Sequence, residues 1–201
     1  RILAVLPSDQ AEREFHAEHV VRYEHHAVLP GFVNAHTHAA MSLFRGLADD
    51  KALVDWLKNH VWPTENRFVN ADFVRDGTEL AMAEMLRSGT TCFNDMYFFP
   101  QAAGRAIQQA GMRASVGLVV IDYPVPGSPD VASHFRQAGD ALDALKHHPL
   151  ITTALAPHAP YSVSDEALRK VVAYSEELDL PIQMHVHETQ GEVDEALQHT
   201  G

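Results

Sequence analysis

Residues 29–38 read LPGFVNAHTH, an extended apolar run that ends in His36 and His38. In a β-strand the spacing i, i+2 places two side chains on the same face. Two neutral imidazoles on one face make half of a metal site, because imidazole is a ligand for zinc and iron. The segment therefore predicts a strand, the end of that strand and a metal site.

The position of the histidine pair in the chain supports a functional role more strongly than the pair itself does. The chain has 14 His in 201 residues, and this density yields roughly one His-X-His pair by chance. His36 and His38, however, follow Pro30-Gly31 and an apolar strand. Active sites of (β/α)8 barrels lie at the C-terminal ends of such strands. A histidine pair on the surface or in the core is the competing interpretation.

The composition favours one globular domain, with 46% hydrophobic and 21% charged residues. A formal net charge of -12 argues against a nucleic-acid partner, which would require clustered Lys and Arg. No apolar run is long enough to span a membrane and no signal peptide is visible, so no membrane partner is expected. The single cysteine, Cys92, excludes an internal disulfide and fits a reducing compartment, so we expect a cytoplasmic protein.

Predicted strands and helices alternate from residue 30 onward. We expect five strands, which lead into His36, cover 90–95, 113–121 and 151–158, and end near His185. Helices are expected at 50–62, 70–88, 101–110, 133–146 and 165–178 and from about residue 192. This alternation predicts a parallel sheet with crossover helices. Further strands are expected at 2–6 and within 20–30, and the chain reads as the first part of a longer polypeptide.

Polar residues follow the ends of several predicted strands. A barrel enzyme gathers its catalytic groups at that end, whereas a structural protein has no reason to do so. The residues in question are His36, His38, Asn94, Asp95, His158, His185 and Glu188.

These groups suggest metal-assisted hydrolysis. His36, His38 and His185 could supply three nitrogen ligands to one divalent cation. Glu188 lies just past the strand end, where a carboxylate can move protons beside a metal-activated water. His187 has the same strand parity as His185, so spacing alone does not choose between them. For His187 we favour a supporting position or a helix start over a ligand role.

Two further residues carry open alternatives. Glu65 follows Trp62-Pro63; it is either a solvent-facing carboxylate at a helix N-terminus or an acceptor for paired substrate hydroxyls. His158 lies between Pro157 and Pro160, which hold its loop rigid, and it is either a capping residue or a substrate contact.

Several motifs in one order resemble the amidohydrolase superfamily. They are LPGFVNAHTHAAMSLFRGLADD (29–50), WLKNHVWPTE (56–65), TTCFNDMYF (90–98), APHAPY (156–161) and HVHET (185–189). More narrowly, the chain resembles the bacterial 5-methylthioadenosine/S-adenosylhomocysteine deaminases. The resemblance runs over nearly the whole chain, and guanine deaminases and triazine hydrolases share much of the pattern.

The resemblance implies a fold and a set of site residues. The expected fold is a (β/α)8 barrel of the metal-dependent hydrolase type, with residues 28–201 as its first half and residues 1–27 as part of a small β-sandwich. His36, His38 and His185 match the metal ligands of the family, and His187 matches none of them. Glu188 matches the residue that binds the ring nitrogen and shuttles the proton.

The implied reaction is the hydrolytic deamination of an adenine nucleoside at C6, which yields the inosine analogue and ammonia. Glu65 matches the residue that holds the ribose hydroxyls, and His158 matches the histidine that contacts the nucleoside. One divalent metal is expected, zinc by default, with iron or manganese as alternatives. A homo-oligomer is also expected.

The chain departs from the family pattern at its end. The family has a further His after its sixth strand and a metal-binding Asp after its eighth, and neither occurs in these 201 residues. Five strands do not close an eight-stranded barrel, so we predict that these residues alone are inactive. Two alternatives stay open, namely a related amidohydrolase acting on guanine, adenosine or a triazine, and a degenerate barrel that binds metal without catalysis.

Overall fold

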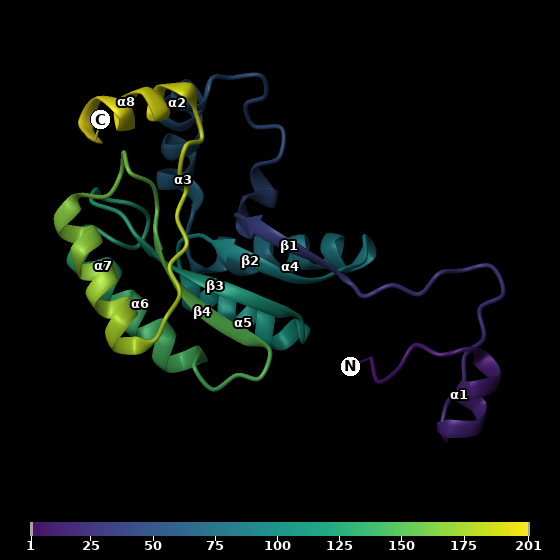
Figure 1. Ribbon diagram of the computed structural model, residues 1–201. Coiled ribbons are helices and arrows are strands. Elements are labelled where there is room, and N and C mark those ends of the chain that lie inside the picture. Colours follow the sequence, from purple (N-terminus) through teal and green to yellow (C-terminus); the bar gives the residue numbers. More distant parts are fainter. Residues whose placement is uncertain (1, 201) are drawn as a thin grey trace. The chain divides into compact units, whose positions relative to one another are not determined.

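The computed structural model describes residues 2–200, and the chain divides into two compact units, residues 1–30 and 31–201. The larger unit contains a four-stranded parallel sheet in the order β1-β2-β3-β4 (Figure 1). The strands are β1 (Phe32–Thr37), β2 (Thr90–Met96), β3 (Arg113–Val120) and β4 (Ile151–Pro157). Sequential order with parallel pairing is the arrangement of consecutive barrel strands, which confirms the predicted α/β class.

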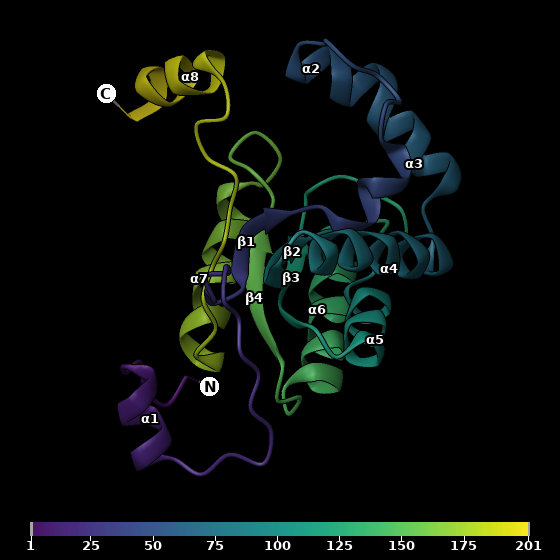
Figure 2. The ribbon, with the colours of Figure 1, turned by 90° about the vertical axis from the view of Figure 1, so that its right-hand side faces the viewer.

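Crossover helices connect these strands and cover one face of the sheet. They are α4 (Ala71–Arg87), α5 (Pro100–Ala110) and α6 (Val131–Leu145), followed by α7 (Asp165–Leu178) after β4. Figure 2 shows α4, α5 and α6 together on one side of the strands. One apolar cluster joins β2 and β3 to α4 and α5, and a second joins β3 and β4 to α6 and α7. None of the helices in the described chain is long and apolar enough to cross a membrane.

Between β1 and α4 the chain forms a run of short helical elements. These are the 3-10 helix η1 (Ala39–Phe44), α2 (Leu53–Asp55), the π-helix η2 (Trp56–Val61) and α3 (Trp62–Phe68). The helix expected at 50–62 is therefore longer than predicted and includes a π-helical turn. Such turns occur at functional sites, and this one leads directly into Glu65.

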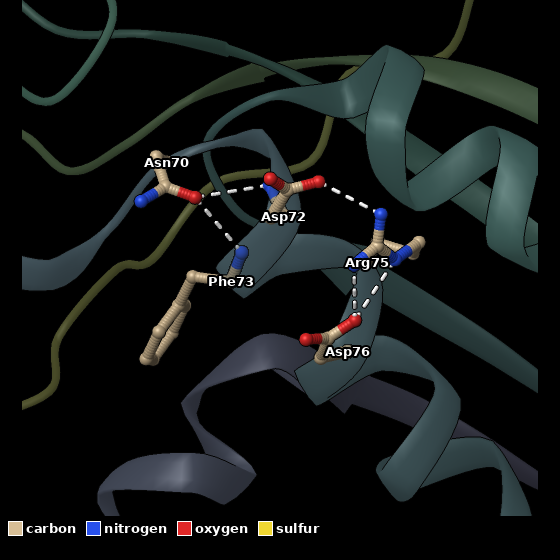
Figure 3. A network of polar contacts seen from close by, with 5 residues as sticks. All are labelled: Asn70, Asp72, Phe73, Arg75 and Asp76. Carbon is tan, nitrogen blue, oxygen red and sulfur yellow. Dashed lines mark hydrogen bonds and ion pairs between the residues drawn. The ribbon is translucent and has the colours of Figure 1, made fainter.

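Helix α4 begins at the residue that the sequence predicts. The Asn70 side chain accepts hydrogen bonds from the backbone N–H groups of Asp72 and Phe73, both at 3.0 Å. Arg75 then pairs with Asp72 at 2.7 Å and with Asp76 at 2.8 Å (Figure 3). At the other end, Gly89 adopts φ +89°, a left-handed conformation suited to glycine, and leads into β2.

Close packing at Gly77 ties α4 to the loop that follows β1. A Cβ atom at this position would lie 2.4 Å from the Ala40 carbonyl oxygen. Only glycine therefore lets the two backbones approach so closely. Ala39 and Ala40, the first residues of η1, are both buried by this contact region.

The expected fifth strand is not a regular strand in the structure. Residues 181–185 follow β4 through hydrogen bonds to Leu155 and His158, but only Ile182 forms a bridge, with Leu155. Pro181 has no N–H to donate. The Gln183 N–H donates to the Leu155 carbonyl, and the His185 N–H donates to the His158 carbonyl. Between these two bonds the chain advances by two residues in this segment but by three residues along β4, so the regular ladder is broken. A last helix, α8 (Gln190–Thr200), follows this segment.

Residues 2–30 contain one helix, α1 (Ser8–Glu14), and no strand among the described positions. The strands expected at 2–6 and within 20–30 are therefore wrong as local assignments. An apolar extended segment becomes a strand only when a partner accepts its backbone hydrogen bonds, and no described segment does so here. The assignment of residues 1–27 to a β-sandwich stays a prediction.

Candidate metal centre

Three histidines that are distant in sequence converge at the C-terminal end of the sheet. The candidate ligand atoms of His36, His38 and His185 all lie within 4.8 Å of one another. The Nε2 atoms of His36 and His185 are 3.3 Å apart, although 149 positions separate the two residues. The three ring centroids are 4.9–5.1 Å apart. The structure thus brings together the three residues that the sequence predicts as ligands.

Backbone carbonyls orient two of these rings. His38 Nδ1 lies 2.6 Å from the Met96 carbonyl oxygen, and His185 Nδ1 lies 2.8 Å from the His158 carbonyl oxygen. A carbonyl only accepts, so each Nδ1 carries the proton and donates it. In the neutral imidazole the Nε2 atom then keeps its lone pair, which is the arrangement that metal-binding histidines use.

The surroundings keep His36 and His38 neutral. Burial, together with repulsion from His185 and His36, lowers the pKa of His38 to about 4, against the smaller effect of the Met96 carbonyl. Burial also lowers the pKa of His36, and His185 adds to that effect. At pH 7 both residues therefore offer lone pairs to a cation without first losing a proton.

A cavity of about 80 Å³ lies beside His38. Glu65, on α3, is only 5% exposed and lines it, so the solvent-facing alternative for this residue is wrong. The Tyr97 hydroxyl donates a hydrogen bond of 2.8 Å to Glu65 Oε1. Burial raises the pKa of Glu65, and the hydrogen bond from Tyr97 opposes that rise. The same cavity is lined by His38, His158 and Tyr123 and by apolar side chains including Trp62, Met96 and Ile121.

His158 connects the cavity to the histidine cluster. Its ring centroid is 4.9 Å from that of His185, and its Nδ1 lies 2.7 Å from Ser162 Oγ. Burial, reinforced by His185, lowers the pKa of this side chain to about 3. A neutral imidazole at this place can accept or donate one hydrogen bond to a bound molecule.

Glu188 and His187 are both exposed. The Tyr161 hydroxyl donates a hydrogen bond of 3.1 Å to Glu188 Oε2. The Glu188 charge acts on His36, where it raises the pKa against the larger effects of burial and His185. His187 is exposed, adopts φ +56° and is not part of the cluster of candidate ligands found among residues 2–200.

Two residues near the site were not assigned a role from the sequence. Tyr97 holds Glu65, and Asp95 accepts hydrogen bonds from both neighbours of His38. Both belong to the segment TTCFNDMYF at the end of β2. Their position at a strand end was the available signal, but a residue's partners across the sheet are not visible in the sequence.

Known proteins resemble this chain in sequence and in fold. A sequence model of the Amidohydrolase family matches residues 27–201. A 5-methylthioadenosine/S-adenosylhomocysteine deaminase of Saccharophagus degradans is 44% identical over 200 residues, which is 100% of this chain and 45% of the relative. A 5'-deoxyadenosine deaminase of Methanococcus maripaludis is 40% identical over 176 residues, or 87% of this chain and 41% of that protein.

A solved structure is similar over the same region. The zinc-bound adenosine deaminase of Xanthomonas campestris superimposes with a TM-score of 0.93 at 44% identity, and the match covers 98% of this chain and 45% of that one. The chain therefore spans less than half the length of the relatives that it matches.

Proposed function

Because this chain belongs to the amidohydrolase family, we propose that it forms the N-terminal part of a metal-dependent aminohydrolase acting on an adenine nucleoside. The observation that carries this proposal is the convergence of His36, His38 and His185. The cavity beside His38 adds polar groups near this cluster, because Glu65 and His158 lie in its wall.

The histidines fit a divalent cation, most simply zinc. Three imidazole nitrogens are a ligand set that Zn²⁺ accepts, and the similar Xanthomonas structure holds zinc. Iron and manganese are the alternatives, because imidazole also suits iron. When bound, the cation would supply Lewis-acid activation of water for attack on the purine. The residue expected to complete the site is an Asp beyond these 201 positions.

The chain's own residues would divide the remaining work. Glu65 would accept hydrogen bonds from the paired ribose hydroxyls, since a carboxylate binds two donors at once. Tyr97 already occupies Oε1, and this contact leaves the other oxygen and the remaining lone pairs for the substrate. His158 would contact the nucleoside from another part of the cavity wall.

Glu188 would act on the purine ring as the proton carrier. Its carboxyl group would hydrogen-bond a ring nitrogen, deliver a proton there and pass a proton to the leaving amino group. The overall reaction consumes one water, breaks the C6–N bond and releases ammonia and the inosine analogue. Tyr161, which donates to Glu188 Oε2, would keep the carboxyl group in place.

The names of some relatives point to a substrate with an altered 5' position. Two of them are named for 5-methylthioadenosine/S-adenosylhomocysteine and for 5'-deoxyadenosine. We therefore propose a 5'-modified adenosine, with 5'-methylthioadenosine as the first candidate. The apolar cavity wall of Trp62, Met96 and Ile121 supports a neutral substituent.

The larger organisation is also a proposal. Residues 28–201 would form the first half of the barrel, and residues 1–27 would belong to a small β-sandwich. The single cysteine supports a cytoplasmic location. A homo-oligomer stays a prediction, which light scattering on the complete protein would check.

The test is metal content and ammonia release in the complete protein. We expect about one equivalent of metal and turnover of 5'-methylthioadenosine, both lost in His185→Ala. Metal binding without ammonia release from any purine or triazine would contradict the proposal and favour a degenerate barrel.

The ribose contact has its own test. Glu65→Gln should weaken use of the nucleoside much more than use of the corresponding free base, because only the nucleoside has the paired hydroxyls. An equal effect on the nucleoside and on the free base would contradict the role of Glu65 in binding the ribose.

A further inference from the structure

A buried carboxylate lies next to the histidine pair of β1. Asp95, on β2, is only 2% exposed, and its Oδ1 accepts hydrogen bonds from Thr37 Oγ1 at 2.9 Å and from the Ala39 backbone N–H at 2.7 Å. Thr37 and Asp95 are register partners in the parallel pair of β1 and β2. Burying a carboxylate is costly unless it is well hydrogen-bonded, so these contacts compensate a real penalty.

The two donors lie on either side of His38. One oxygen of Asp95 holds the side chain of the preceding residue and the backbone of the following one. The next residue of β2, Met96, holds the His38 ring through its carbonyl oxygen at 2.6 Å. Two consecutive residues of β2 thus restrain the backbone around His38 and the rotation of its ring.

The burial of the Asp95 carboxylate is not explained by an ion pair. Among the described residues, no Lys or Arg side chain forms a salt bridge with Asp95, and all the ion pairs found involve exposed groups of other elements. Its partners are instead the strand end and the loop that carry His38. A small apolar residue would fill a core position without the cost of burying a charge.

We propose that Asp95 is a positioning residue that sets the geometry of His38 for metal binding. This inference rests on the proposed function only in that His38 must be a metal ligand. Asp95 does not touch the metal or the substrate; it acts through the backbone on both sides of His38. Supporting contacts of this kind change metal affinity by about 10–100-fold when they are removed.

The test is zinc affinity of the metal-free complete protein, measured by competition with a chromogenic chelator. Asp95→Ala should raise the Kd for zinc by about 10–100-fold. Asp130→Ala is the matched control, because Asp130 also accepts from one backbone N–H (2.7 Å) and one hydroxyl (2.6 Å), both of Ser133. This control should leave the Kd within about twofold of the native value, since Asp130 caps α6, away from the histidines.

If Asp95→Ala does not fold, a less disruptive pair of variants still tests the effect on zinc affinity. Thr37→Val removes one of the two donors and should weaken zinc binding several-fold. Thr78→Val is its control, because Thr78 is fully buried on α4 and its hydroxyl has no hydrogen-bond partner among the described residues. Equal Kd values for the two valine variants, or for Asp95→Ala and the native protein, would overturn the proposal.

The outcome separates this inference from the proposed function. If the native protein binds zinc, His185→Ala abolishes binding and Asp95→Ala does not change it, only the inference fails. If the native protein does not bind zinc and His185→Ala makes no difference, the metal centre itself is wrong.

Discussion

The residues of the site depend on contacts that local sequence does not show. His38 and His185 each donate Nδ1–H to a backbone carbonyl, so the other nitrogen of each ring faces the cluster. Glu65 is similar, because its burial and its hydrogen bond to Tyr97 come from an element that lies 32 positions away. Each residue's chemistry therefore depends on burial and on neighbours that lie far away in the sequence.

Tyr97→Phe tests the contact to Glu65. Loss of the hydroxyl leaves a buried carboxylate oxygen without its donor, which costs about 1–3 kcal/mol. It also lets the pKa of Glu65 rise further, because the hydrogen bond from Tyr97 now lowers it. We expect KM for the nucleoside to rise about fivefold or more with kcat changed little, in steady-state kinetics of the complete protein.

Tyr174→Phe is the control for this variant, because Tyr174 is 41% exposed on α7 and packs on Phe135. Its KM should equal the native value. A Tyr97→Phe enzyme that loses kcat but keeps its KM would contradict a role in substrate binding.

The buried histidines predict a pH effect on the metal-free protein. Burial holds the pKa of His38 at about 4 and that of His158 at about 3 in the folded state, below the value of about 6.5 in an unfolded chain. Below pH 6.5 the unfolded chain therefore binds more protons, and stability falls until the folded groups titrate as well. Asp95 opposes this loss between pH 6 and 4, because burial raises its folded-state pKa to about 6.

Urea unfolding at pH 7.5 and pH 5 measures this effect. His158→Asn should reduce the loss of stability between the two pH values by an amount of order 1–2 kcal/mol. His148→Asn is a suitable comparison, because His148 is half-buried in the loop before β4 and accepts a hydrogen bond from the Leu150 N–H. An unchanged pH dependence in His158→Asn would show that this side chain titrates normally.

At the scale of elements, the end of β1 is held in place by α4. The helix has its own start signal at Asn70 and packs against the segment after His38 through Gly77. A local capping motif and a close backbone approach therefore combine to position the loop that follows the histidine pair.

Asn70→Ala removes the cap of α4. Its side chain accepts from two backbone N–H groups, and loss of such a cap costs about 0.5–2 kcal/mol. Chemical denaturation measures the change. Asn59→Ala serves as the control, since its side chain contacts only the exposed Asp55, and we expect an effect below about 0.5 kcal/mol.

Gly77→Ala tests the packing of α4 against η1. The added methyl group would lie 2.4 Å from the Ala40 carbonyl oxygen, so one of the two backbones must move. We expect a loss of about 1–3 kcal/mol in the free energy of unfolding. Gly139→Ala in α6 meets no atom within 4 Å and should instead stabilise the protein by about 0.4–1 kcal/mol. The same sign for both substitutions would contradict the packing argument.

At the scale of the whole molecule, the sheet has an open side. β1 pairs only with β2 in the described chain, and its apolar residues Phe32 and Val33 are 61% and 68% exposed. Closure of a barrel requires further strands between β4 and β1. The relatives are more than twice as long as the matched region, which leaves room for those strands.

A polypeptide of these 201 residues should therefore show no deamination. We also expect it to self-associate, because an exposed apolar edge strand pairs readily with other chains. Ammonia release and analytical ultracentrifugation measure the two properties. A monomer with full turnover would overturn the assignment of the chain to half of a barrel.

Much of the fold could be predicted from the sequence, because its signals are local. The helix start at Asn70, the stop at Gly89 and the apolar strand predicted at 90–95 all follow from residues within a few positions of each other. The predictions for 2–6 and 20–30 failed as strands, because a ladder depends on a partner strand as well as on apolar residues. The strand expected to end near His185 has β4 as a partner, but its hydrogen bonds shift in register and leave a single bridge.

The sequence by itself determined the α/β alternation and the polar residues at the strand ends, since hydrophobic period and turn residues act over short distances. Only the tertiary structure decided that His36 and His185 lie 3.3 Å apart, that Glu65 is buried against Tyr97, and that Asp95 holds both neighbours of His38. The physical reason is that parallel pairing brings the carboxyl ends of distant strands together. Which side chains then meet depends on register and burial, which no local pattern contains.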